Sequence, residues 1–205
     1  MILSFDTSLP LLSVALLRGE TILGALALVG KDSRNEKLLP AVDWLLAQTR
    51  VEKEQLELIV VTRGPGSFTG VRVGLATAQG LALALGRTIC AMSTHEAIAF
   101  AVSEQGRRLV VDDAGRGDFY VSAFEGEEET IPPTLVANDR LSAIAAEFEE
   151  VIEVKRALDR VNVALVAATR ARELARTERL DRYRDTTPLY VRLAEAEVKL
   201  QQRRG

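Results

Sequence analysis

The segment GPGSFTGVRVGLATAQGLALAL, residues 64–85, constrains the fold most, because it predicts a helix with almost no charge. From Val71 to Leu85 the only charged residue is Arg72. Gly70 and Gly74 lie on one side of this helix and permit close backbone approach, so we expect a sheet to cover that side. A surface helix normally presents a charged stripe to water. The opposite side of this helix therefore requires a second cover.

The preceding helix, predicted within residues 32–50, shows the same imbalance. Trp44, the only tryptophan, lies nearly opposite the apolar stripe of Leu38, Val42 and Leu45. Apolar residues gathered outside a core mark contact sites for other proteins. We therefore predict a partner surface formed by Lys37, Ala41, Trp44, Gln48, Phe68, Arg72, Leu75, Ala76, Gln79 and Leu83. The alternative is that the two helices simply cover each other.

Apolar runs separated by turn residues predict an α/β fold with a mixed sheet. In the first half we expect strands at 1–6, 11–18, 21–29, 56–62 and 87–93, with helices at 32–50 and 68–85. In the second half we expect strands at 107–113 and 117–126, a solvated acidic hairpin tip at 125–129, and helices at 139–150 and 162–177, the last capped by Asn162. This order predicts an N-terminal lobe, 1–103, that carries the docking helices, and a smaller C-terminal lobe, 104–205, whose last helix is free to pack back on the first lobe.

Gly64, Gly66 and Gly70 do not match the phosphate-binding motifs. Their GxGxxxG spacing is one residue longer than the dinucleotide-binding fingerprint, and no GK[ST] follows as a P-loop requires. We expect the first two glycines to form a tight turn and Ser67 to cap the helix. The weak candidates for a cofactor phosphate are Asp6, Thr7 and Ser8 in the first hairpin.

Composition and charge limit the partners. With 47% hydrophobic and 27% charged residues the chain is a soluble globular type, and its net charge of -3 argues against tight nonspecific nucleic-acid binding. Residues 151–205 hold 13 of the 26 lysines and arginines against 8 acidic residues. That excess indicates either contact with RNA or a solvated helix face. The start, MILSFDTS, leads us to expect no signal peptide and no membrane span.

Four stretches resemble the TsaB (YeaZ) family: FDTSLPLLSVALL, TRGPGSFTGVRVGLATAQGLALAL, DDAGRGDFYVSAF and PLYVR. The resemblance extends from Met1 to about Arg192, and its most specific part is GPGSFTGVR at 64–72. Two loops depart from the family pattern: SRNEKLLP lacks the usual histidine, and Asp113-Ala114-Gly115 replaces Asp-Ala-Arg. The detailed contacts that the family makes in these two loops are therefore not expected to carry over to this chain, whereas the rest of the resemblance is unaffected.

The resemblance implies an actin-like ATPase (ribonuclease-H-like) fold with two lobes, mixed sheets and a reduced second lobe. It implies a non-catalytic, cytoplasmic subunit of the complex that makes threonylcarbamoyladenosine at position 37 of tRNA. It also implies binding to the catalytic subunit TsaD and a homodimer when alone, both through the two helices described above. The ATPase TsaE would be recruited through the pair with TsaD. Contact with tRNA would be indirect. The chain would hold no cofactor by itself, and binding of ATP or ADP at a subunit interface of the complex stays an alternative.

The residues themselves argue against catalysis. The TsaD family binds its metal through a His-x-x-x-His pair, and the single histidine of this chain, His95, cannot form one. The single cysteine, Cys90, is expected to be a core thiol and suits a reducing cytoplasm. Carboxylates at strand ends, here Asp112, Asp113 and Asp118, are formal magnesium ligands but more often form turns. We therefore predict no catalytic residue and no metal site.

The alternative function is a small ATP-dependent kinase of the actin-like superfamily, which would use the hairpin containing Asp6. Such a kinase also needs a second phosphate loop and an adenosine pocket, and no glycine-rich adenosine motif occurs in the second half. A stand-alone RNA-binding module is a third hypothesis. It is disfavoured because no basic segment carries interleaved aromatic residues for base stacking.

Overall fold

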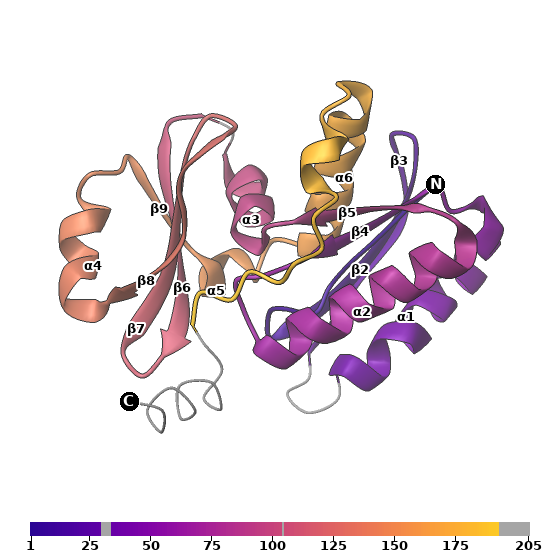
Figure 1. Ribbon diagram of the computed structural model, residues 1–205, viewed down its shortest axis with the longest axis horizontal. Coiled ribbons are helices and arrows are strands. Elements are labelled where there is room, and N and C mark those ends of the chain that lie inside the picture. Colours follow the sequence, from indigo (N-terminus) through magenta and orange to yellow (C-terminus); the bar gives the residue numbers. More distant parts are fainter. Residues whose placement is uncertain (30–33, 104, 193–205) are drawn as a thin grey trace.

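The computed structural model describes residues 1–29, 34–103 and 105–192 (Figure 1). The first half forms a five-stranded sheet in the order β3-β2-β1-β4-β5. β1, β2 and β3 form an antiparallel meander, whereas β4 and β5 run parallel to β1. The strands are β1 (Ile2–Asp6), β2 (Leu11–Arg18), β3 (Thr21–Val29), β4 (Leu58–Thr62) and β5 (Thr88–Met92). The predicted three-stranded meander and both later strands of this half are confirmed.

Helices cover both faces of this sheet (Figure 1). One face packs against α1 (Arg34–Thr49) and α2 (Phe68–Leu85), with the short helix η1 (Lys53–Gln55) between them in the chain. The other face packs against α6 (Val163–Arg176), which contacts β1 and β2. Along β4, Ile59 faces the first core and Val60 the second. Burial on both faces explains why the central strands are continuous apolar runs.

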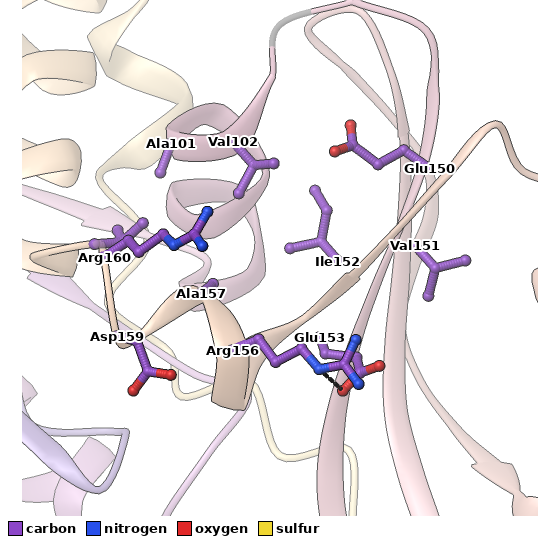
Figure 2. A pocket seen from close by; sticks show the side chains of 11 residues that line it. Ala101, Val102, Glu150, Val151, Ile152, Glu153, Arg156, Ala157, Asp159 and Arg160 are labelled. Carbon is purple, nitrogen blue, oxygen red and sulfur yellow. Dashed lines mark ion pairs between the residues drawn. The ribbon is translucent and has the colours of Figure 1, made fainter.

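The second half forms a four-stranded mixed sheet in the order β8-β7-β6-β9. Its strands are β6 (Arg107–Gly115), β7 (Asp118–Glu125), β8 (Glu128–Ala137) and β9 (Glu150–Glu153). Helix α4 (Asn138–Ala145) covers one face, while α3 (Thr94–Val102) and α5 (Val154–Ala157) lie on the other, close to β9 (Figures 1 and 2). The predicted helix 139–150 is too long, because the chain leaves the helix after Ala145 and residue 150 begins a strand that pairs with β6.

The start of α2 lies against the loop that follows β1. Ser67 Oγ accepts a hydrogen bond from Gly70 N at 3.3 Å, so the predicted cap is confirmed. Gly64 and Gly66 have φ values of 96° and 153°, which a side chain would disfavour. A Cβ atom at Gly74 would lie 2.5 Å from Thr7 Oγ1, and one at Gly70 would overlap the Thr7 carbonyl group. The predicted close packing of Gly70 and Gly74 is therefore confirmed.

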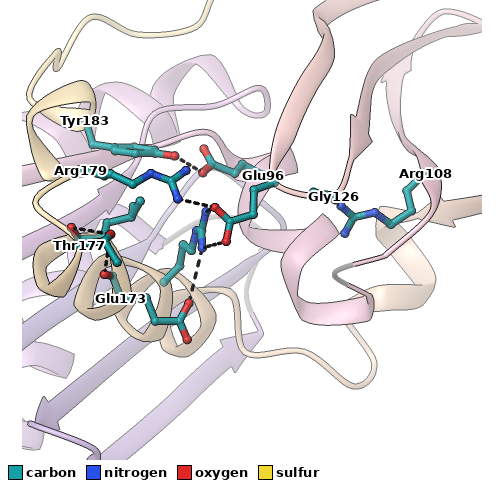
Figure 3. A network of polar contacts seen from close by, with 10 residues as sticks. Glu96, Arg108, Gly126, Glu173, Thr177, Arg179 and Tyr183 are labelled. Carbon is teal, nitrogen blue, oxygen red and sulfur yellow. Dashed lines mark hydrogen bonds and ion pairs between the residues drawn. The ribbon is translucent and has the colours of Figure 1, made fainter.

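The turn between β7 and β8 is tied to α6 by a polar network (Figure 3). Arg170 Nη1 donates to Glu127 Oε1 at 3.1 Å, and Arg179 Nη1 donates to Glu127 Oε2 at 2.5 Å. The buried Arg108 donates to the Gly126 carbonyl oxygen, and Tyr183, in the short helix η2 (Leu180–Tyr183), donates to Glu96 at 2.5 Å. The acidic tip at 125–129 was expected to be only solvated. That expectation is wrong for Glu127, because two arginines from the C-terminal part of the chain reach it.

We predict that Gly70→Ala destabilises the protein, because the added methyl group meets the Thr7 backbone, which cannot move aside like a flexible side chain. Overpacking of this kind costs about 1–3 kcal/mol. Gly80→Ala is the matched control in the same helix, since a Cβ there has no described atom within 4 Å, and alanine is expected to stabilise an exposed helix position by up to about 1 kcal/mol. Urea unfolding measures both, and equal effects would contradict the close packing.

The Glu127 network predicts a pH dependence of stability. Hydrogen bonds from Arg170 and Arg179 lower the pKa of Glu127 from 4.5 to about 2. The pKa of Glu127 is therefore lower in the folded state than in the unfolded state. The ionised Glu127 thus contributes its full stabilisation of the fold above about pH 4.5, and this stabilisation is lost as the pH falls toward 2. We expect the Tm difference between the wild type and Glu127→Gln to shrink between about pH 5 and pH 3. Glu128→Gln, at an exposed neighbouring position, should show no such convergence.

Candidate functional site

The outer face of α1 leaves large apolar side chains uncovered. Trp44 is 56% exposed and Leu39 is 49% exposed. Lys37 and Gln48 are exposed on the same helix. Ala41 is buried, so its predicted outward position is wrong.

The outer face of α2 also lacks a charged stripe. Leu83 is 87% exposed, and Arg72, Ala76 and Gln79 are exposed as well. Leu75 is buried, which is a second correction to the predicted surface. Ala41 and Leu75 belong to the same buried core cluster, which α1 and α2 form with the strands of the first sheet. α1 and α2 contact each other, but the alternative that they simply cover each other does not account for the exposed Trp44 and Leu83.

Part of the α2 outer face is covered by the chain itself, through residues 184–192, which we call the C-terminal strap. The strap runs from η2 across the start of α2 toward the second lobe (Figure 1). Leu189 N donates to the Arg63 carbonyl oxygen at 2.8 Å, and Arg63 Nη1 pairs with Asp185 at 2.9 Å. At its far end Arg192 donates to the Ala114 carbonyl oxygen at 3.1 Å and pairs with Asp118 in the second sheet.

Three predicted surface residues contact this strap. Arg72 Nε donates to the Tyr190 hydroxyl at 2.6 Å, and the Phe68 and Tyr190 rings lie 4.7 Å apart. Gln79 Nε2 donates to Thr186 Oγ1 at 2.9 Å. The part of the predicted surface that remains uncovered is therefore the α1–α2 outer face, which we define as Lys37, Trp44, Gln48, Ala76 and Leu83. Periodicity does not predict the strap, since its sequence, RDTTPLYVR, has neither helical nor strand spacing.

The candidate phosphate residues lie inside the protein. Asp6, Thr7 and Ser8 are all buried. Thr7 Oγ1 donates to the Gly70 carbonyl oxygen at 2.7 Å, and Ser8 Oγ donates to Asp6 Oδ1 at 2.5 Å. Ser67 N donates to the Ser8 carbonyl oxygen at 2.7 Å. Each of these donors is directed at the protein's own oxygen atoms, so none is aimed at a bound phosphate.

Burial is the main cause of the shifted pKa values of two carboxyl groups, those of Asp6 and Asp112. It raises the pKa of Asp6, with hydrogen bonds from Ser8 and Thr62 acting in the opposite direction. Burial also raises the pKa of Asp112 to about 6. These groups favour the neutral form more than exposed carboxyl groups do, which weakens them as cation ligands.

The remaining sequence candidates serve the fold. His95 is fully buried with Nδ1 2.9 Å from Ser122 Oγ, and burial lowers its pKa to about 3. Cys90 is a buried thiol whose pKa burial raises to about 12. Asp113 Oδ1 accepts a hydrogen bond from Gly115 N at 2.7 Å, as expected of a turn former. Within residues 1–29, 34–103 and 105–192, no three His, Cys, Asp or Glu side chains are grouped to hold a metal ion.

Comparison with known proteins gives consistent matches. A family model described as "TsaD: tRNA N6-adenosine threonylcarbamoyltransferase" matches residues 29–171. The chain is 36% identical over 129 residues to the tRNA threonylcarbamoyladenosine biosynthesis protein TsaB of Bacillus subtilis, covering 60% of this chain and 55% of that protein. It is 39% identical over 132 residues to TsaB of Haemophilus influenzae, covering 62% and 55%. The chain thus spans 55% of the length of these curated relatives.

A solved structure, YeaZ from Pseudomonas aeruginosa, matches the fold with a TM-score of 0.67 at 24% identity. The match covers 92% of this chain and 98% of that one. The predicted actin-like, ribonuclease-H-like fold with two mixed sheets is therefore confirmed.

The contacts of Tyr190 predict how strongly the C-terminal strap is held against the start of α2. Tyr190→Ala removes both the ring contact with Phe68 and the hydrogen bond from Arg72, whereas Tyr190→Phe keeps the ring. Aromatic and cation–π contacts contribute about 0.5–1.5 kcal/mol each, so the alanine variant should raise the exchange rate of the Leu189 amide about tenfold. Hydrogen exchange followed by mass spectrometry measures this rate. An unchanged rate in the alanine variant would show that Tyr190 does not hold the strap.

Proposed function

This chain belongs to the TsaB (YeaZ) family, and we propose that it is a non-catalytic scaffold subunit in the synthesis of threonylcarbamoyladenosine at position 37 of tRNA. The observation that carries the proposal is the α1–α2 outer face. Two adjacent helices expose Trp44 and Leu83 on a face whose other members are Ala76, Gln48 and the charged Lys37. Exposed aromatic and aliphatic side chains surrounded by small residues are typical of protein–protein contacts.

The proposed partner on this face is the catalytic subunit TsaD, with the ATPase TsaE recruited through the resulting pair. In the absence of TsaD, the same face would pair with a second copy of this chain. Contact with tRNA would be indirect. Several arginines of the basic C-terminal quarter already pair with acidic residues, including Arg176 with Glu20 and Arg184 with Asp181, which favours a solvated surface over an RNA site.

The absence of catalysis by this subunit is supported by its buried hairpin. A kinase of the same superfamily would need the loop at Thr7 and Ser8 to meet a phosphate, and here both residues are buried against α2. The single histidine is buried against Ser122 and is not presented to a substrate. We propose that the subunit holds no cofactor alone and that any ATP or ADP would bind where it meets its partner.

We propose a cytoplasmic location, in keeping with work on tRNA. One helix, Phe68–Leu85, is long and apolar enough to cross a membrane by length and composition alone, with a mean hydropathy of 1.3. Its inner side packs on β4 and β5, and its outer side belongs to the α1–α2 outer face. Its apolar character therefore has an explanation within a folded protein and a protein contact.

We predict that Trp44→Glu and Leu83→Glu leave the monomer's stability nearly unchanged, because surface substitutions usually change it by less than about 0.5 kcal/mol. Both should abolish capture of TsaD from the same organism and dissociate any homodimer, because each places a charge in a dehydrated contact. Thermal melting, pull-down and light scattering measure these effects. Leu135→Glu is the control, since Leu135 is 36% exposed on β8 of the other sheet.

The scaffold role is tested by a tRNA modification assay with purified TsaD and TsaE. Activity should require this chain and should be lost with Trp44→Glu but retained with Leu135→Glu. If both variants at the α1–α2 outer face unfold the protein, these residues belong to the core and the face is not a docking surface. If both fold normally and still support binding and modification, the docking surface lies elsewhere.

A further inference from the structure

A pocket of about 650 Å³ lies at the β9 edge of the second sheet, where α3, β9, α5 and the segment before α6 meet (Figure 2). None of the sequence-predicted site residues lines it, and it is separate from the α1–α2 outer face. Its volume is within the range of pockets that hold small molecules.

The lining of this pocket is apolar at its centre. Ile152 and Ala157 are buried and form part of the lining. Val102, which also lines it, is 42% exposed, whereas the Val151 side chain lies on the other side of β9 from Ile152 (Figure 2). The exposed Val102 beside this recess favours a ligand with an apolar body, because its binding would remove the valine surface from water.

Two charged side chains extend toward the pocket from opposite sides (Figure 2). Arg160 enters from the segment that follows α5, and Glu150 enters from the start of β9, with Val102 and Ile152 between them. Within the described part of the chain, neither side chain has a hydrogen bond or ion pair. By contrast, Arg156 and Glu153 at the same pocket neutralise each other, with Nε and Oε2 3.1 Å apart.

We propose that this pocket binds a small zwitterion with an apolar body. Its carboxylate would accept hydrogen bonds from the Arg160 guanidinium, whose planar fork matches a carboxylate. Its ammonium group would pair with Glu150, and its hydrocarbon part would cover Val102 and Ile152. An α-amino acid with an aliphatic side chain and a linear amino acid share this chemistry.

The test is calorimetric titration of the full chain with leucine, aminohexanoate, hexanoate and hexylamine. At least one zwitterion should bind about tenfold or more tightly than hexanoate and hexylamine, because each of these lacks one charge-assisted contact. Tighter binding of leucine would assign an α-amino acid, and tighter binding of aminohexanoate a linear one. Failure of both zwitterions to bind at millimolar concentration, or equal binding of hexanoate, overturns the proposal.

Variants locate the binding. Arg160→Gln and Glu150→Gln should each weaken the zwitterion about tenfold, with the melting temperature confirming that each variant folds. Arg140→Gln is the control, because Arg140 is exposed on α4 and does not line the pocket. Binding that survives both pocket substitutions would show that the zwitterion sits elsewhere and would also overturn the proposal.

Discussion

The close approach between α2 and the loop after β1 determines much of this structure. At Gly66 and Gly74 an added Cβ atom would lie 2.5 Å from an atom of that loop. Hydrogen bonds from Ser67 N and from Thr7 Oγ1 join the same two segments. The amide groups at a helix start attract phosphate in many nucleotide-binding folds. Here the Ser67 amide donates to the Ser8 carbonyl oxygen, so the contact that positions the helix also occupies one amide that could otherwise bind a phosphate.

The two lobes are tied at two separate hairpins. The β7–β8 turn is held by Arg170 and Arg179 through Glu127, and the β6–β7 turn is held by Arg192 of the C-terminal strap. Because the strap also binds Arg63 and the start of α2, the second lobe is connected to the helix that carries Leu83. Ties at both hairpins oppose the opening and closing that a nucleotide-driven enzyme needs, and they suit a subunit that presents a fixed surface.

The sequence predicted most of the first sheet because its strands are continuous apolar runs and its turns carry local signals. The caps at Ser67 and Asn162 are equally local, and both occur. Prediction failed where distant contacts decide the structure. β9 has four residues after an acidic stretch with helical spacing, and only pairing with β6 makes it a strand. Helical spacing likewise separates two faces of α1 and α2, but it does not show that Ala41 and Leu75 are buried in the first core.

The three glycines inside α2 have different physical explanations. A glycine within a helix destabilises the folded protein by about 0.5–1 kcal/mol relative to an alanine at the same position. At Gly70 and Gly74 the contact with Thr7 explains the choice, since no side chain would fit. At Gly80 a Cβ would have no described atom within 4 Å, so the folded chain itself does not require a glycine there. Gly80 lies between Ala76 and Leu83 on the exposed side of α2. A helix surface without side chains at that point would let another backbone approach closely, in keeping with the docking proposed for Leu83 and Trp44. The same residue type thus permits close packing on the loop after β1 at one end of the helix and leaves the helix surface uncovered at the other.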